Sequence, residues 1–268
     1  MKTELFVFSG TGNSLSCARE LADRLGECEI RSIPAALSER HPAAASRIVG
    51  LIFPLYFMGP PRVVLEFIRR ADLDSASYLF AVVTRGGSPG DAIHILRREL
   101  GRRSLRLDAG FYVTYWTNFI PRYRAPSEKR RSSLARRAGR RIREIAAFVG
   151  REGTAKGREL SLLDPLARWV WNRWLGKLKE WDRRFTVNER CTSCGICERI
   201  CPVDNIRMEG LHPSWVRRCE SCLACLHFCP VEAIQFGKRT RGKRRCRHPG
   251  IDAEDLMVLK RARCAHSL

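Results

Sequence analysis

The amino end of this 268-residue chain lacks a long hydrophobic run. Its apolar stretch, within MKTELFVF, is too short for the core of a signal peptide or for a membrane span. Acidic residues are also scarce, because 28 Asp and Glu stand against 49 Lys and Arg, giving a formal net charge of +21. Such a positive field favours an acidic protein partner, an anionic ligand, nucleic acid or an anionic membrane surface, and by itself selects none of them.

The twelve cysteines lack the even distribution that a disulfide framework would have. Eight of them lie between Cys191 and Cys229. The other four are expected to be buried or free thiols: Cys17, Cys28, Cys246 and Cys264.

The crowded cysteines form two copies of one pattern. CTSCGICERICP (191–202) returns as CESCLACLHFCP (219–230), and each copy reads C-x2-C-x2-C-x3-C-P. This pattern resembles the bacterial two-cluster ferredoxin signature, in which the fourth cysteine of one run binds the cluster of the other run. The resemblance implies two ligand sets: Cys191, Cys194 and Cys197 with Cys229, and Cys219, Cys222 and Cys225 with Cys201.

The repeat continues beyond these ligands. Val203 and Ile206 correspond to Val231 and Ile234, apolar residues that would cover the clusters and limit the access of water. Zinc is the competing metal, because paired C-x2-C motifs also describe a zinc ribbon. Four cysteines in each copy and two Cys-Pro endings favour two 4Fe-4S clusters. Such clusters need a reducing compartment, so we expect a cytoplasmic protein.

The first part of the chain contains an anion-binding pattern. Glu4–Phe8 predicts a short strand that leads into the loop SGTGNS (9–14) and then into a helical stretch up to Leu25. The backbone N–H groups and hydroxyls of this loop, with the helix dipole, would point at one phosphate. A Walker loop would need a lysine before Ser14, and the dinucleotide fingerprint would need a third glycine where Leu15 stands.

Two further strands end in unusual loops. Arg47–Phe53 predicts a buried strand before PLYFMGPP (54–61), and Tyr78–Thr84 predicts another before RGGSPG (85–90). Helical stretches follow both loops, and a fifth strand fits Leu105–Val113. Alternating strands and helices predict a parallel doubly wound sheet, whose ligands bind beyond the carboxyl ends of the strands. All three loops are expected at that edge.

These three loops resemble those of a flavodoxin. With the cysteine repeat behind them, nearly the whole chain is similar to the bacterial ferredoxins that carry an amino-terminal flavodoxin-like domain. The similarity implies an α/β fold: a doubly wound parallel five-stranded sheet in the order 2-1-3-4-5, followed by a small α+β two-cluster ferredoxin module. The implied cofactors are FMN and two 4Fe-4S clusters.

The same resemblance implies which residues contact FMN. They are Ser9, Thr11, Gly12, Asn13 and Ser14 at the phosphate, Tyr56, Phe57 and Gly59 at the isoalloxazine ring, and Gly86, Gly87 and Ser88 on its other side. Core packing is the alternative role for the two aromatic residues. Ordinary flavodoxins surround their flavin with acidic residues, whereas the neighbours here are Arg62, Arg85, Arg122 and Arg124. We expect this positive potential to stabilise the reduced anionic flavin and to raise its midpoint potential.

The chain is expected to divide into four segments. These are the flavodoxin-like FMN-binding domain (1–152), a linker with an amphipathic Trp-rich helix (153–183), the ferredoxin domain (184–237) and a basic C-terminal tail (238–268). The Trp-rich helix is expected to dock the two cofactor domains together, and contact with an anionic membrane is the alternative. The tail is expected to be solvated, or else to bind an acidic redox protein. No nucleic-acid-binding motif accompanies it.

Joining these cofactors would couple one-electron to two-electron chemistry. A cluster passes one electron at a time, whereas a flavin accepts two. We therefore expect an electron-transfer protein. Three alternatives remain open: a reductase of a small molecule in a pocket shaped by Trp116, Asn118 and Arg122, a redox-responsive nucleic-acid binder acting through the tail, and a ferredoxin whose appended domain has lost its flavin.

Overall fold

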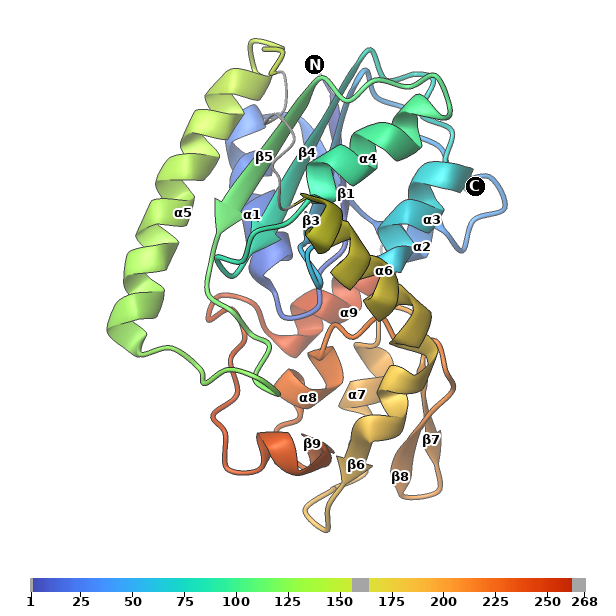
Figure 1. The fold of residues 1–268 in the computed structure, drawn as a ribbon, viewed down its shortest axis with the longest axis vertical. Helices are drawn as coiled ribbons and strands as arrows, with labels where there is room; N and C mark the ends of the chain where they lie inside the picture. Colours follow the sequence, from blue (N-terminus) through green and yellow to red (C-terminus); the bar gives the residue numbers. More distant parts are fainter. Residues whose placement is uncertain (1, 156–163, 262–268) are drawn as a thin grey trace.

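The first domain is built on a parallel sheet. In the computed structural model, which describes residues 2–155 and 164–261, five strands lie in the order β2-β1-β3-β4-β5, with every neighbouring pair parallel (Figure 1). The strands are β1 (Thr3–Val7), β2 (Cys28–Ser32), β3 (Ile48–Pro54), β4 (Tyr78–Arg85) and β5 (Ala109–Thr114). This strand order is that of the flavodoxin-like fold, so the predicted sheet is confirmed.

Helices cover both faces of this sheet. α1 (Asn13–Leu25) and α5 (Glu128–Val149) pack on one face, and α2 (Ile33–Ala36), α3 (Arg62–Arg70) and α4 (Ala92–Gly101) on the other (Figure 1). β3 and β4 are therefore buried almost throughout, which is why they read as continuous apolar runs. The expected strand at Leu105 begins only at Ala109, because Asp108 uses its carboxylate to accept the N–H of Leu79 at 2.9 Å.

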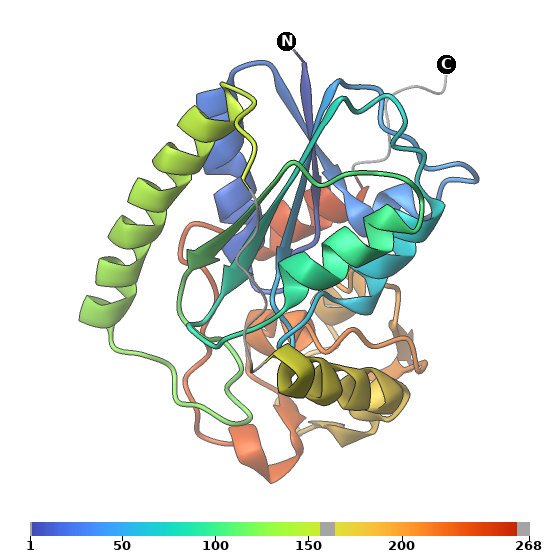
Figure 2. The ribbon, with the colours of Figure 1, turned by 45° about the horizontal axis from the view of Figure 1, so that its top comes forward.

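The cysteine-rich part forms a small second module at the carboxyl edge of the sheet. β6 (Phe185–Val187) pairs antiparallel with β9 (Ile234–Phe236), and β7 (Ile206–Glu209) pairs antiparallel with β8 (His212–Trp215). One short helix belongs to each cysteine run: α7 (Ile196–Arg199) and α8 (Ala224–Phe228). Both views show this module directly below the strand ends of the first domain (Figures 1 and 2).

The Trp-rich segment forms helix α6 (Asp164–Trp181), which packs against the first domain and leads into the second. Trp171, Trp174 and Leu178 are buried with Leu65 of α3 and Ile95 of α4. The indole N–H of Trp171 donates to the carbonyl of Pro60 at 2.9 Å. Among the described residues, no helix is long and apolar enough to cross a membrane. The contacts favour the docking role, although Leu166 at the start of the helix is exposed rather than packed.

The C-terminal segment is not a solvated tail, so that expectation is wrong for residues 238–261. After a 3-10 turn, η2 (Gly237–Thr240), the chain runs back across the first domain, with Cys246 and Ile251 buried. It ends in α9 (Ala253–Arg261), which packs beside β2 and α2 (Figure 2). Apolar residues between the basic ones anchor this segment, and the long cationic side chains extend from it.

We predict that α6 docks through one face only. Leu178→Ala should destabilise the protein by about 2–5 kcal/mol, because this fully packed side chain is 1% exposed and its loss leaves a cavity. The control Leu166→Ala removes a side chain that is 55% exposed and should change stability by less than about 0.5 kcal/mol. Anaerobic denaturant unfolding measures both. Equal effects would show that α6 does not dock as described.

Candidate functional site

The eight cysteines surround two separate cavities. The first, the outer cavity, is lined by Cys191, Cys194, Cys197 and Cys229. The second, the inner cavity, is lined by Cys201, Cys219, Cys222 and Cys225. The structure therefore brings together the two sets that the ferredoxin signature implies, each with its fourth cysteine from the other run. Among the described residues, no group of three or more His, Cys, Asp or Glu side chains is spaced to hold a single metal ion.

The backbone around the two cavities repeats in detail. Left-handed residues occur at matched positions of the two runs: Ser193 and Ser221 (φ 54° and 58°), Gly195 and Leu223 (φ 69° and 61°), and Asp204 and Glu232 (both φ 51°). Five of these six are not glycine, so this backbone is strained in both copies. Two of the three matched pairs lie between successive cysteines, where the left-handed conformation turns the chain.

Backbone N–H groups point at the cysteine sulfur atoms. The N–H groups of Asn205, Ser221 and Ala233 each donate to a sulfur at 3.2 Å, those of Cys201, Cys219 and Cys229 respectively. Burial raises the pKa of the Cys225 thiol well above its usual value, and neighbouring cysteines raise it further. Four such thiols ionise together only when a positively charged metal centre compensates them, so metal binding here would release protons.

The two cavities differ in their access to solvent. Cys194 of the outer cavity is exposed, and Cys191 and Cys229 are half-buried. In the inner cavity Cys201, Cys219 and Cys225 are buried, and Cys222 faces the first domain.

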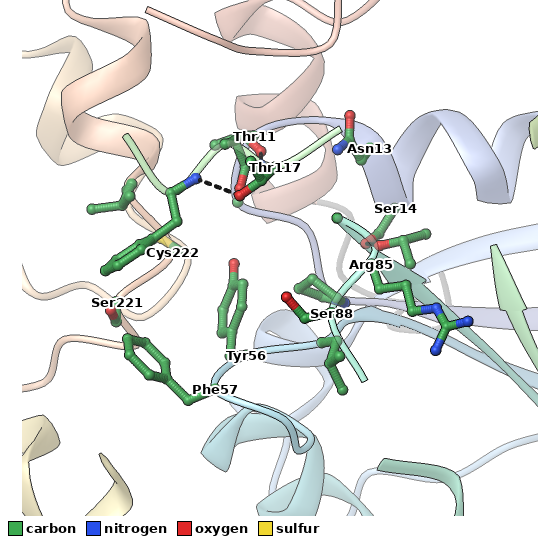
Figure 3. A pocket seen from close by; sticks show the side chains of 18 of the residues that line it. Thr11, Asn13, Ser14, Tyr56, Phe57, Arg85, Ser88, Thr117, Ser221 and Cys222 are labelled. Carbon is green, nitrogen blue, oxygen red and sulfur yellow. Dashed lines mark hydrogen bonds between the residues drawn. The ribbon is translucent and has the colours of Figure 1, made fainter. Parts of the chain in front are cut away.

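A third and larger cavity of about 240 Å³ lies between the first domain and the second module (Figure 3). Its walls are the loops that follow β1, β3, β4 and β5, together with Val170 of α6 and the segment Ser221–Leu223. Figure 3 shows Tyr56 and Phe57 on one side of it, with Thr11, Asn13 and Ser14 at the start of α1 and Arg85 at the end of β4. Both domains therefore contribute to this cavity.

Most of the residues predicted to contact FMN line this large cavity. They are Ser9, Thr11, Asn13, Ser14, Tyr56, Phe57, Gly86 and Ser88. Gly12, Gly59 and Gly87 are not among the described residues that line it. A Cβ on Gly12 would lie 2.8 Å from Ile251, and one on Gly59 would overlap the Trp171 indole, so both glycines allow a close neighbour instead.

The large cavity contains buried polar atoms that lack a partner among the described residues. These atoms are Asn13 Oδ1, Arg85 Nε, Trp116 Nε1 and Ser221 Oγ. Because unpaired buried polar atoms are costly, such a group indicates a polar ligand. Phe57 and Met58 add strain, since both have positive φ (46° and 76°) in the tight turn closed by Tyr56 and Gly59. The residues present fit an anionic aromatic cofactor such as FMN.

The FMN prediction did not include the loop after β5, which contributes Trp116, Thr117, Asn118 and Phe119 to the wall. The sequence analysis names Trp116 and Asn118 only for the alternative of a small-molecule reductase, and nothing in the sequence pattern marks Thr117 and Phe119 as ligand-binding residues. Of the four arginines expected near the flavin, Arg85 and Arg122 line the cavity. Arg62 instead pairs with the buried carboxylate of Glu220 at 2.8 Å, and Arg124 is exposed outside the cavity wall.

The junction between the domains is closest at Gly10. A Cβ on Gly10 would lie 2.7 Å from both the Cβ and the carbonyl oxygen of Cys222, and 2.9 Å from the Tyr56 hydroxyl. The loop after β1 therefore touches a cysteine of the inner cavity directly. Burial raises the pKa of Tyr56 well above its usual value, with Cys222 adding to the effect, so this hydroxyl keeps its proton.

Buried His227 links the module to two other segments. Its Nδ1 accepts the N–H of Cys246 at 3.0 Å, so its Nε2 carries the proton and donates to the carbonyl of Asn118 at 2.8 Å. Burial lowers the pKa of His227 to about 4, which keeps the ring neutral. This histidine is a structural bridge in the described part of the chain, and the four-cysteine sets are complete without it.

The comparisons with known proteins bear on both parts of the chain. Residues 190–234 match the family described as "4Fe-4S dicluster domain". No curated protein matches the chain. Among solved structures, rubredoxin oxygen:oxidoreductase from Desulfovibrio gigas is 16% identical over 55% of this chain and 37% of its own, with a TM-score of 0.31. The Megasphaera elsdenii flavodoxin is 13% identical over 52% of this chain and 99% of its own, with a TM-score of 0.30. The strand order, rather than these weak likenesses, establishes the fold of the first domain.

We predict that Gly10 is required for the contact between the domains. Gly10→Ala should cost about 1–3 kcal/mol, because the added methyl group overlaps Cys222 and has nowhere to move. The matched control is Gly101→Ala at the end of α4, where no atom lies within 4 Å of the added Cβ, and it should be neutral within about 0.5 kcal/mol. Thermal and denaturant unfolding report the difference. A Gly10→Ala protein as stable as the control would contradict the close contact.

Proposed function

We propose that this protein, in which a domain of flavodoxin-like topology is followed by a 4Fe-4S dicluster domain, transfers electrons between two 4Fe-4S clusters and one FMN. The observation that carries the proposal is that Cys222 lines both the inner cysteine cavity and the large cavity. A cluster and a flavin held by these residues would be in contact through one side chain. Electrons would pass one at a time between the clusters and the flavin, which can hold two of them.

Different residues of the chain would hold the phosphate, enclose the ring and shield the outer cluster. Ser9, Thr11, Asn13 and Ser14 would hold the phosphate, with the N-terminus of α1 contributing its positive dipole. Tyr56 and Phe57 would bound the ring. Trp174 stacks on Phe57 with the ring centroids 5.0 Å apart and keeps that wall in place. Apolar neighbours such as Ile196 and Ile234 would keep water from the outer cluster.

The position of the second module favours a carrier over a reductase with a small-molecule substrate. Ser221, Cys222 and Leu223 form part of the wall of the large cavity, and Val170 of α6 forms another part. A reductase needs one face of its flavin open to a substrate, whereas here the cluster module covers part of that space.

The proposal predicts a defined cofactor content. Anaerobically purified protein should contain roughly eight irons, eight sulfides and one FMN per chain. Cys194→Ser and Cys222→Ser should each remove roughly half of the iron, because each cysteine belongs to a different cavity. Cys28→Ser is the control, since this thiol lines neither cavity, and it should keep the full content. Chemical analysis and electron paramagnetic resonance measure the result, and bound zinc or colourless protein would refute the proposal.

A second prediction concerns the flavin potential. Arg85 lines the large cavity, so Arg85→Met should lower the midpoint potential of the two-electron flavin couple by removing a positive charge that favours the reduced anion. Arg98→Met removes the same charge from an exposed site on α4 and should leave the potential nearly unchanged. Spectroscopic redox titration distinguishes the two. A wild-type couple as low as that of acidic flavodoxins would oppose the expected effect of the arginines.

A further inference from the structure

Two segments that lie far apart in the sequence form one basic face. The first runs from the loop after β5 into the start of α5 (119–131), and the second is the first part of the C-terminal segment (238–247). Together they contain twelve Lys and Arg and a single acidic residue, Glu128. We refer to these two segments together as the basic face.

Hydrogen bonds join the two halves of the basic face. Lys243 donates its ammonium N–H to the carbonyl of Ile120 at 2.7 Å, and Arg244 donates to the carbonyl of Pro126. The buried Cys246 and the bridging His227 hold the second segment against the first domain. The two segments therefore form one fixed surface rather than two mobile arms.

The outward charges of the basic face are not compensated. Seven of its arginines are exposed: Arg122, Arg124, Arg130, Arg239, Arg241, Arg244 and Arg247. None of them pairs with an acidic side chain of the described residues. Arg122 and Arg247 instead lie over the rings of Tyr123 (5.8 Å) and Phe228 (5.1 Å). Their charges are therefore available to a partner.

The basic face borders the large cavity. Arg122 and Tyr123 belong to the face and also line the cavity, and Tyr123 is 44% exposed. A protein that docks here would lie next to the cofactor that the large cavity holds. Charge and an exposed aromatic residue are both typical of a docking surface.

We propose that the basic face is the docking surface of an acidic redox protein that exchanges electrons with the cofactor of the large cavity. This inference rests on the proposed function. At each encounter one electron passes from the reduced protein to the oxidised protein, and no bond is formed or broken. The positive face would steer the acidic partner and raise the association rate. A nucleic acid would also be attracted, but it has no need of a surface beside a redox cofactor.

The test uses matched charge reversals in the full-length holoprotein. Arg124→Glu with Arg247→Glu changes two exposed residues of the basic face that lie outside the cavity wall. Arg140→Glu with Arg143→Glu makes the same change of net charge on exposed positions further along α5. Stopped-flow mixing with a chemically reduced acidic two-cluster ferredoxin, at about 0.02 M and about 0.3 M salt, gives the second-order rate constants. Flavin and iron content, and reduction by dithionite, verify that each variant is intact.

We expect the Arg124/Arg247 variant to react at least about tenfold more slowly at low salt, and its rate to depend less on salt. The Arg140/Arg143 variant should stay within about threefold of the wild type. Equal losses in both variants, or no loss in either, would overturn the docking surface while the cofactor content leaves the proposed function standing. Wild-type protein without flavin would instead overturn the proposed function.

A second experiment tests whether the basic face binds nucleic acid. Fluorescence anisotropy with a labelled single-stranded oligonucleotide, at about 0.15 M salt, measures binding to the same three proteins. We expect weak binding that differs little among them. Tight binding that only the Arg124/Arg247 variant loses would overturn the proposal in favour of a nucleic-acid partner.

Discussion

The contact between the loop after β1 and Cys222 is the constraint on which the rest of the structure depends. Gly10 leaves no space between the two, so the phosphate-type loop of one domain and a cysteine of the other share a wall. A larger residue at position 10 would overlap Cys222 and force the two segments apart. The electron-transfer proposal needs this contact, because cofactors in distant domains would exchange electrons slowly.

Three independent attachments keep the domains in this arrangement. Helix α6 packs its indoles against α3 and α4 and continues through Trp181 into the aromatic contacts with Phe236 of the second module. Glu220, which follows Cys219, pairs with Arg62 and accepts the N–H of Val63 at the start of α3. The C-terminal segment crosses back to place the N–H of His248 on the carbonyl of Thr11 at 2.9 Å. Because the three attachments involve different segments of both domains, together they oppose separation of the domains.

The three cavities differ in where they reach solvent. Three cysteines of the inner set are buried and the fourth, Cys222, borders the large cavity, whereas the outer set reaches the surface at Cys194. The large cavity opens beside the basic face at Arg122 and Tyr123. The outer cavity and the large cavity therefore meet solvent at different places. The inner cavity lies between them, because Cys222 lines both it and the large cavity. This arrangement suits a protein that relays electrons rather than one that stores them.

The sequence by itself determined the elements whose signals are local. Eight cysteines at fixed spacing, the SGTGNS loop and apolar runs such as Arg47–Phe53 predict the module, the phosphate-type loop and the parallel sheet, because each depends on residues close together in the chain. The tertiary structure decided how these parts meet. The sequence pattern of KRTRGKRRCR predicts a solvated tail because it shows only charge, whereas the fold supplies His227 and Thr11 as partners that hold this segment in place. The loop after β5 and the pairing of Arg62 with Glu220 likewise depend on residues more than a hundred positions apart, and no local pattern encodes such contacts.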